Sequence, residues 1–279
     1  MNLPGNAKPH TQAPANACDC HVHIYDPAAP VTQPGMRAPA DASVEDYRQL
    51  QRSNGTTRTV IVQPAVYRTD NRVTVEAVAK LGNARGIAVL HPDVADTHLH
   101  ELHEAGIRGV RFTQHDPKTA VTTPEMIAPL TGRIQVHGWH AQIHMLGDRL
   151  VEMASLIEAL PGTIVIDHMG RAPQPGGVNH PAVALVRRWL EEGRTWVKLS
   201  GAYLNTAVGA PGYSDAGEIA KAYVQAAPAR CVWGSDWPHP TEREKPDDAV
   251  LFDLLADWAG SRANVERILV DNPAQLYGF

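Results

Sequence analysis

The feature that most constrains the fold is an alternation along the chain, in which eight short apolar or β-branched runs are separated by longer segments of helical periodicity. The predicted strands are 18–24, 57–63, 86–90, 106–112, 139–144, 163–167, 196–200 and 231–235. The predicted helices are 43–52, 72–81, 96–105, 124–137, 149–160, 181–192, 215–226 and 247–259. In the first helix, Ser43 is followed three residues later by Asp46, a variant of the capping box. This alternation is typical of repeated strand–helix units with a parallel sheet.

Eight parallel strands joined by right-handed crossovers can close on themselves, and closure removes the exposed edges of an open sheet. We therefore predict the α/β class and a single-domain (β/α)8 TIM barrel over residues 17–279, preceded by a flexible N-terminal arm over residues 1–16. The length of 279 residues suits such a barrel, which typically takes about 250. A doubly wound open sheet is the alternative, but no glycine-rich phosphate loop follows the first predicted strand.

The composition argues against several classes of partner. A net charge of −5 and a pI near 6.3, with scattered Lys and Arg, do not supply the basic surface that nucleic acids require. The first sixteen residues hold no apolar leader and no run of about 18 apolar residues occurs, so we expect a cytoplasmic protein without a membrane partner. The three cysteines, Cys18, Cys20 and Cys231, are too few for a disulfide framework and suit buried strand positions. A homo-oligomer is compatible with the sequence.

Two histidines near the end of the first predicted strand are the first candidates for chemistry. In the run CDCHVHIYD, His21 and His23 are two residues apart, so they point to the same side of a strand, about 6–7 Å apart. In a barrel, the C-terminal ends of the strands converge on one mouth, where active sites are built. This spacing suits two ligands of one metal ion or two donors to one oxyanion.

Three further polar residues interrupt apolar strands at the same predicted mouth. His144 ends the fifth strand, His168 follows the sixth, and Asp236 follows the eighth. A carboxylate directly after an apolar strand is costly unless it is paired or used, because burial disfavours its charge. We therefore predict that Asp236 is functional, whereas His144 could equally be a hydrogen-bonded core residue.

Several other residues could line a substrate. Arg111, at the end of the fourth strand, offers a planar fork suited to a carboxylate, or a salt bridge within the mouth. Arg171, Tyr203 and Asn205 lie near the ends of strands six and seven and are further wall candidates. His239 could orient Asp236 or cap its loop, and we expect His91, after the third strand, to be structural.

Four motifs in this order carry a family resemblance: D-C-H-V-H near the start, D-H-M-G-R in the middle, and G-S-D-W-P-H-P and D-N-P-A-Q-L-Y near the end. Together they resemble the 2-pyrone-4,6-dicarboxylate lactonase group of the amidohydrolase superfamily, over residues 18–277. The resemblance implies that Asp236 activates water while His21, His23 and His168 polarise the lactone carbonyl. It also implies that Arg111 matches a carboxylate-binding arginine.

The chain departs from the pyrone-dicarboxylate pattern at three places. QHDPK follows strand four and G-A-Y-L follows strand seven where that group carries further arginines, and His144 stands in place of a tyrosine. The segment QPAVYRTDN (63–71) is closer to relatives that act on sugar-acid lactones or muconolactones. We therefore predict a small lactone with fewer carboxylates than a pyrone dicarboxylate.

Several alternatives remain open at this point. His21, His23, His144 and Asp236 could bind one Zn²⁺ or Mn²⁺, as in mononuclear metal-dependent amidohydrolases or decarboxylases of the same superfamily, and a metal-free site is the close alternative. A lactone isomerase is a further alternative. The resemblance implies that isomerases of this group have Asn at the position of Asp236, so the carboxylate in this chain favours hydrolysis. A barrel that binds a small molecule without turnover is the non-enzymatic alternative.

Overall fold

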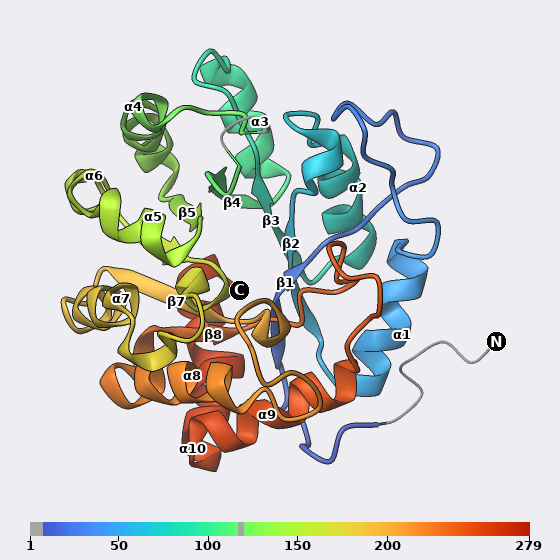
Figure 1. Cartoon of the computed structure of the whole chain (residues 1–279). Helices are drawn as coiled ribbons and strands as arrows, with labels where there is room; N and C mark the ends of the chain where they lie inside the picture. Colours follow the sequence, from blue (N-terminus) through green and yellow to red (C-terminus); the bar gives the residue numbers. More distant parts are fainter. Residues whose placement is uncertain (1–7, 117–119) are drawn as a thin grey trace.

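The computed structural model describes residues 8–116 and 120–279, and eight parallel strands form one sheet in the order β1 to β8 (Figure 1). The strands are β1 (Cys18–Val22), β2 (Arg58–Val62), β3 (Ala84–Ala88), β4 (Ile107–Thr113), β5 (His140–His144), β6 (Ile164–Ile166), β7 (Thr195–Leu199) and β8 (Cys231–Trp233). Helices surround this sheet on the outside (Figure 1). The prediction of a single-domain (β/α)8 barrel is confirmed.

The helices follow the predicted rhythm with additions. They are α1 (Val44–Asn54), α2 (Arg72–Leu81), α3 (Asp96–Glu104), α4 (Pro124–Ile134), α5 (Gly147–Glu152), α6 (Ala154–Ala159), α7 (Pro181–Glu191), α8 (Ser214–Ala226), α9 (Asp248–Ala259), α10 (Arg262–Glu266) and α11 (Asn272–Tyr277). Short 3-10 turns are η1 (Ala65–Tyr67), η2 (Gln135–His137), η3 (His168–Arg171), η4 (Gly177–Asn179), η5 (Ala202–Leu204) and η6 (Pro228–Arg230), and η7 (Arg267–Asp271) is a π-helix. The capping box at Ser43 is confirmed, because Ser43 and Asp46 exchange both side-chain-to-backbone hydrogen bonds.

Most predicted elements differ from the structure by a few residues at their ends, and two differ for a local reason. The predicted helix 149–160 is divided at Met153, whose backbone (φ −95°, ψ 8°) leaves helical geometry between α5 and α6. The third strand was predicted at 86–90, but it runs from Ala84 to Ala88. It stops there because the side-chain amide of Asn71 takes both backbone polar groups of Val89, at 3.0 Å each, in place of a neighbouring strand.

The barrel closes between β1 and β8 through a short seam. Val22 and Trp237 form an isolated parallel bridge, and the backbone N–H of Asp236 donates to the carbonyl of His21 at 2.8 Å. Gly234 permits this approach, since a Cβ there would lie 2.6 Å from the Cβ of His21. The buried carboxylate of Asp19, also on β1, accepts hydrogen bonds from the N–H and hydroxyl of Ser235. The seam therefore fixes Asp236 beside His21.

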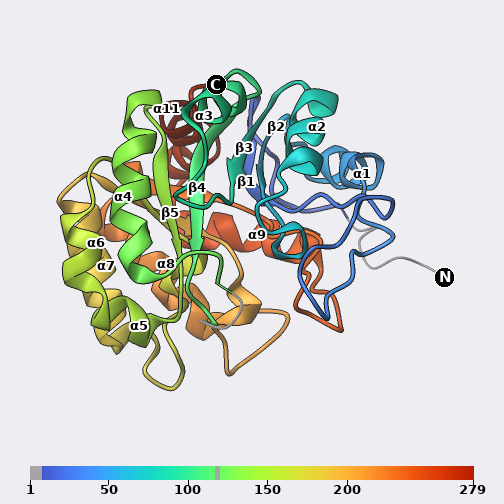
Figure 2. The same cartoon turned by 90° about the horizontal axis from the view of Figure 1, so that it is seen from above.

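The opposite, N-terminal end of the barrel is sealed by the end of the chain. Figure 2 shows α11 and the C-terminus at this end. Tyr277 is buried in an apolar cluster with strand residues such as Cys18, Val60 and Val232. The guanidinium of Arg85 lies 4.8 Å from the ring centre of Phe279. Helices 262–277 were not predicted from the sequence, whereas all three cysteines are free and buried, as expected.

The described part of the predicted N-terminal arm is attached to the barrel. The backbone N–H groups of His10 and Thr11 donate to the carboxylate of Asp253 on α9, at 3.0 and 2.6 Å. This contact limits the freedom expected for residues 8–16; residues 1–7 lie outside the described part of the chain. Among the described residues, every helix is too short or too polar to cross a bilayer.

Candidate active site

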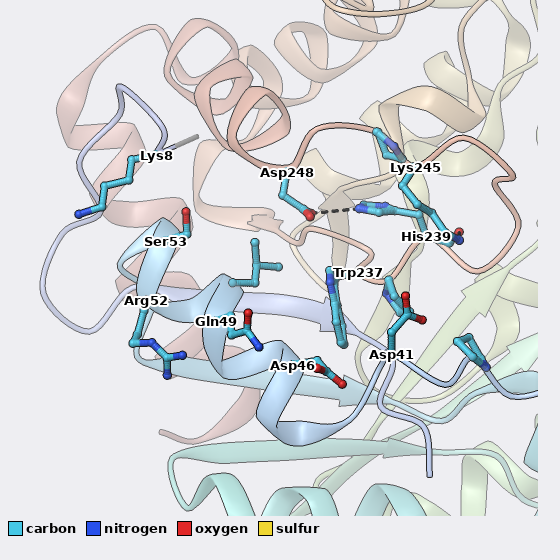
Figure 3. A pocket seen from close by; sticks show the side chains of 14 residues that line it. Lys8, Asp41, Asp46, Gln49, Arg52, Ser53, Trp237, His239, Lys245 and Asp248 are labelled. Atoms are coloured by element: carbon cyan, nitrogen blue, oxygen red, sulfur yellow. Dashed lines mark hydrogen bonds and ion pairs between the residues drawn. The ribbon is translucent and has the colours of Figure 1, made fainter. Parts of the chain in front are cut away.

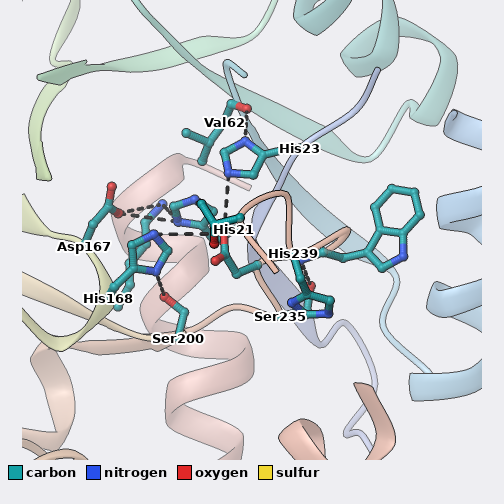
Figure 4. Close-up of polar contacts among 12 residues, drawn as sticks. His21, His23, Val62, Asp167, His168, Ser200, Ser235 and His239 are labelled. Carbon is teal, nitrogen blue, oxygen red and sulfur yellow. Dashed lines mark hydrogen bonds and ion pairs between the residues drawn. The ribbon is translucent and has the colours of Figure 1, made fainter. Parts of the chain in front are cut away.

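A group of histidines and carboxylates gathers at the C-terminal end of the strands. Figure 4 shows His21, His23 and His168 turned towards one another, with Asp167 beside them. The ring centres of His21 and His168 are 4.6 Å apart, and those of His21 and His23 are 5.0 Å apart. All of these residues are buried. The four predicted catalytic residues, His21, His23, His168 and Asp236, are thus brought together.

Asp236 lies at the centre of this group. Its Oδ1 is 3.4 Å from Nε2 of His23, 3.5 Å from Nε2 of His21 and 3.9 Å from Nε2 of His168. Burial would raise the pKa of the Asp236 carboxyl, but His168, His23 and His21 outweigh it and hold that pKa well below its usual range. Its backbone has φ of 65°, a left-handed conformation that side chains other than glycine seldom adopt. Such strain is concentrated at functional sites, and here it aims an ionised carboxylate at three imidazoles.

The rings of His23 and His21 present Nε2 to Asp236. His23 Nδ1 donates to the carbonyl of Val62 at 2.8 Å, which leaves its Nε2 as an acceptor in the neutral ring. His21 Nδ1 lies 3.4 Å from Oδ1 of Asp167 and 3.4 Å from Nζ of Lys198. Burial and Lys198 lower the pKa of His21 well below its usual value, so the ring is neutral at pH 7. His21 Nε2 is buried and has no hydrogen-bond partner among the described residues.

His168 is held by a second buried network. Arg111 donates through Nε to Oδ2 of Asp167 at 2.8 Å, and its Nη2 lies 3.3 Å from Nε2 of His168. Because arginine only donates, His168 Nε2 accepts here, and its Nδ1 donates to the hydroxyl of Ser200 at 2.9 Å. Burial is the main cause that lowers the pKa of His168 to about 4. Arg111 therefore makes the salt bridge within the mouth that was the alternative to substrate binding.

Asp167 and Lys198 are buried members of the site that the sequence analysis did not identify. Burial would raise the pKa of Asp167, but Arg111, His21 and Lys198 hold it well below the usual range. Lys198, on β7, donates to the carbonyl of Cys20 at 2.9 Å. Each left a signal in the sequence, since Asp167 directly precedes His168 and Lys198 is a charge inside the apolar run TWVKL.

His144 does not join the group around Asp236. Its ring packs edge-on against His168, with centres 5.3 Å apart, and stacks on His115 at 5.8 Å. The ring of His168 contacts both His21 and His144, so His144 lies beyond it. Both ring nitrogens of His144 are buried without a hydrogen-bond partner among the described residues. His144 is therefore absent from the two groups of possible ligand atoms that lie within 4.8 Å of one another among the described residues.

The other predicted wall residues have different roles. The hydroxyl of Tyr203 donates to Oδ2 of Asp236 at 2.6 Å, and the amide of Asn205 donates to the backbone carbonyls of His168 and Gly201. Neither polar group is free for a substrate. Arg171, at the end of η3, makes no hydrogen bond or ion pair with any residue that the structure describes.

Two more histidines resolve alternatives left by the sequence. His239 lies in the network of Asp236, since its Nδ1 is 3.2 Å from the hydroxyl of Tyr203. His91 is partly exposed and pairs with Asp93 at 2.7 Å, outside the site, as a structural residue would.

The donor atoms around Asp236 fit one divalent cation. Across residues 8–116 and 120–279, two groups have ligand atoms within 4.8 Å of one another: His21, His23 and Asp236, and His21, Asp167 and His168. In the second group Arg111 already engages both Asp167 and His168. In the first, the Nε2 atoms of His21 and His23 lie 3.5 and 3.4 Å from Oδ1 of Asp236, and the Val62 carbonyl orients His23 as outer partners of metal ligands do.

Comparison with known proteins gives a consistent result. The amidohydrolase family model matches residues 18–279. The chain is 34% identical to a 2-pyrone-4,6-dicarboxylate hydrolase of Comamonas testosteroni, over 97% of this chain and 93% of that protein. It is 35% identical to a 4-sulfomuconolactone hydrolase of Rhizobium radiobacter, over 95% and 91%. It is 30% identical to a D-galactarolactone isomerase of Agrobacterium fabrum, over 99% and 95%.

The architecture also matches a solved structure. An apo crystal structure of an Agrobacterium tumefaciens protein superposes with a TM-score of 0.88 and 27% sequence identity, covering 97% of this chain and 98% of that one. The likeness extends over the whole barrel, including the strands that carry the candidate site.

Proposed function

Since the chain belongs to the amidohydrolase family, we propose that it is an enzyme that hydrolyses the ester bond of a small, carboxylated lactone of the muconolactone or sugar-acid lactone type. One observation carries the proposal: the ionised carboxylate of Asp236 faces the Nε2 atoms of His21, His23 and His168 in a buried cluster of polar groups. A base beside a centre that can polarise a carbonyl, either the imidazoles or an ion that they hold, is the arrangement that acyl transfer to water requires.

Asp236 performs the proton transfers in this proposal. Its carboxylate takes a proton from the attacking water, whose oxygen forms a bond to the lactone carbonyl carbon. When the ring C–O bond breaks, the carboxyl returns that proton to the leaving alkoxide, and the product is a hydroxy acid. A pKa well below 3.8 makes Asp236 a weak base, so close positioning and exclusion of bulk water must compensate.

We propose that His21, His23 and Asp236 hold one divalent ion, Zn²⁺ or Mn²⁺, without His144. When bound, such an ion would polarise the lactone carbonyl and lower the pKa of a coordinated water. The tautomers of His23 and His168 support this choice over a metal-free site, because both rings donate through Nδ1 and so lack an Nε2 proton for an oxyanion in the neutral form.

We propose that Arg171 and His144, rather than Arg111, bind the acidic group of the substrate. Arg111 is already held by Asp167 and His168, whereas Arg171 is unpaired within the described residues and His144 has two unused nitrogens. The names of the two hydrolases among the relatives, a dicarboxylate and a sulfomuconolactone enzyme, also describe anionic lactones.

A lactone isomerase is the second candidate, because one relative carries that name. An isomerase transfers the acyl group to another hydroxyl of the substrate instead of to water. The carboxylate of Asp236, positioned to deprotonate water, favours hydrolysis. We also place the enzyme in the cytoplasm, where its three free cysteines would stay reduced.

The proposal is tested by following acid release at neutral pH from a panel of carboxylated and neutral lactones, with protein purified without chelator. We expect release from carboxylated lactones, about one equivalent of metal by elemental analysis, and loss of activity on chelation that readdition reverses. Full activity in chelator with far less than one equivalent of metal would contradict the metal site. Absence of acid release across the panel would contradict the lactone hydrolase.

A further inference from the structure

A cavity outside the candidate active site lies beside the loop that carries Asp236. It has a volume of about 430 Å³ and lies between α1, the N-terminal arm and the loop that follows β8 (Figure 3). Trp237, His239 and Asp248 contribute to its wall, whereas His21, His23 and His168 do not. The loop that carries Asp236 therefore separates this cavity from the candidate active site.

A chain of hydrogen bonds connects the wall of this cavity to Asp236. Asp248 Oδ1 lies 3.0 Å from Nε2 of His239, a contact drawn in Figure 3. His239 Nδ1 lies 3.2 Å from the hydroxyl of Tyr203, and that hydroxyl donates to Oδ2 of Asp236 at 2.6 Å. The Tyr203 and His239 rings also meet edge to face, with centres 5.2 Å apart. These residues come from η5, the loop after β8 and the start of α9.

The donor roles along the chain follow from its ends. Tyr203 gives its single proton to Asp236, and the oxygen of the same hydroxyl lies against Nδ1 of His239. The carboxylate of Asp248 only accepts, so His239 Nε2 donates. The imidazole is thereby fixed by two hydrogen bonds, and it directs the hydroxyl of Tyr203 towards Asp236.

We propose that Tyr203, His239 and Asp248 form a positioning chain that holds Oδ2 of Asp236, so that Oδ1 faces the histidines and the substrate. The inference rests on the proposed function, and it changes the role of Tyr203 from a substrate-wall residue to a partner of the base. The backbone supports it, because Asp236 and His239 both have left-handed φ values, 65° and 56°, and the N–H of His239 donates to the carbonyl of Asp236. A carboxylate on such a strained loop needs a second anchor to keep one orientation.

Removal of individual links tests the chain. We expect Tyr203→Phe to lower kcat about 10- to 100-fold, the usual scale for loss of an outer partner, with KM changed less than about twofold. Asp248→Asn should lower kcat less than Tyr203→Phe does, because an amide oxygen can still accept from His239. Gln49→Ala is the matched control, since Gln49 lines the same cavity outside the chain, and it should retain full kcat. Values of kcat within twofold of the wild type for Tyr203→Phe would overturn the proposal.

Chemical rescue separates positioning from a structural effect. His239→Gly would open a space continuous with the cavity, so added imidazole should enter it, bridge Asp248 and Tyr203, and restore most of the lost kcat with saturation. A variant that merely folds poorly would not respond, and its Tm is measured in parallel. Absence of rescue, or equal stimulation of the Gln49→Ala control, would overturn the assignment of the cavity as the outer end of the chain.

A readout without turnover keeps this inference distinct from the lactonase proposal. The short contact between Tyr203 and Asp236 should give a far-downfield proton resonance in the free protein that is absent in Tyr203→Phe and Asp236→Asn and shifted in His239→Gly. Such a resonance in a protein that opens no lactone would support the chain and refute the function. Lactone hydrolysis without that resonance would do the reverse.

Discussion

The two ends of the barrel bury different kinds of side chain. At the mouth, ionised and polar side chains are buried together, and five of the eight non-glycine residues with positive φ in the described part of the chain lie there: His168, Met169, Arg171, Asp236 and His239. At the opposite end, apolar strand residues pack around Tyr277 and the chain end covers them. Each left-handed residue costs on the order of 1–3 kcal/mol, whereas apolar burial stabilises the fold.

The contrast indicates that the two ends of the barrel have different roles, one in stability and the other in catalysis. The sealed end supplies stability, and the mouth holds a strained and charged arrangement that stability elsewhere maintains. Substitutions of mouth residues that face the substrate should therefore change catalysis with small effects on folding. Substitutions at the sealed end should do the opposite.

The largest effect on catalysis is expected for Asp236→Asn. Loss of a general base lowers kcat by about 100-fold or more, while the amide keeps the volume of the side chain and removes a buried charge. Steady-state kinetics measures the loss of kcat and thermal unfolding measures stability, and Tm should not fall. Near-normal kcat would contradict the role of Asp236.

The corresponding change at the sealed end is Tyr277→Ala. It should lower the free energy of unfolding by about 3–5 kcal/mol, because a fully buried aromatic ring leaves a cavity, with kcat per folded molecule unchanged. Tyr277→Phe is the control, since the buried hydroxyl has no hydrogen-bond partner within the described residues and its removal should cost little. A large fall in kcat for Tyr277→Ala would break the proposed separation of the two ends.

The two arginines at the mouth, Arg171 and Arg111, are expected to differ in role although they lie in the same region. Arg171→Met should raise KM for a carboxylated lactone about 10-fold or more, with little change for its neutral ester, because the charge contact is lost. Arg111→Met should instead lower stability by about 3–5 kcal/mol, since it leaves Asp167 buried without its main partner. If Arg111→Met selectively raised KM for the charged substrate, the assignment of the two residues would be reversed.

The smallest effect is expected from pH. With the pKa of His168 at about 4 and that of Asp236 well below its usual range, neither group titrates near neutrality, so kcat should vary less than about twofold between pH 5.5 and 8. Because unfolded His168 has a pKa near 6.5, the unfolded chain binds the proton first, and stability should fall as pH drops from about 6.5 to 4. An acidic limb of kcat near pH 6.5 would show that a histidine must lose a proton for turnover.

The periodicity of the sequence was sufficient to predict the barrel, because the patterns that distinguish strands from helices involve residues close together in the chain. The clustering of His21, His23, His168 and Asp236 could also be predicted, since the strand ends of a barrel converge. The pairing of polar groups across strands could not. Arg111 engages Asp167, 56 residues away, through distances that no local pattern specifies.

Two further features escaped the sequence analysis for the same reason. Asp248 reads as an ordinary first-turn acidic residue of α9, and only the fold brings it to His239. The displacement of His144 from the metal group depends on where the ring of His168 lies, which is a matter of side-chain packing.

The central claim, that Asp236 delivers water to a lactone, is tested most directly by turnover in H₂¹⁸O followed by mass spectrometry. A responsive carboxylated lactone should give a ring-opened hydroxy acid that carries one ¹⁸O atom in its new carboxylate, and Asp236→Asn should abolish this incorporation. A product that has the same mass as the substrate and carries no label would show acyl transfer within the molecule, and would contradict hydrolysis in favour of isomerisation.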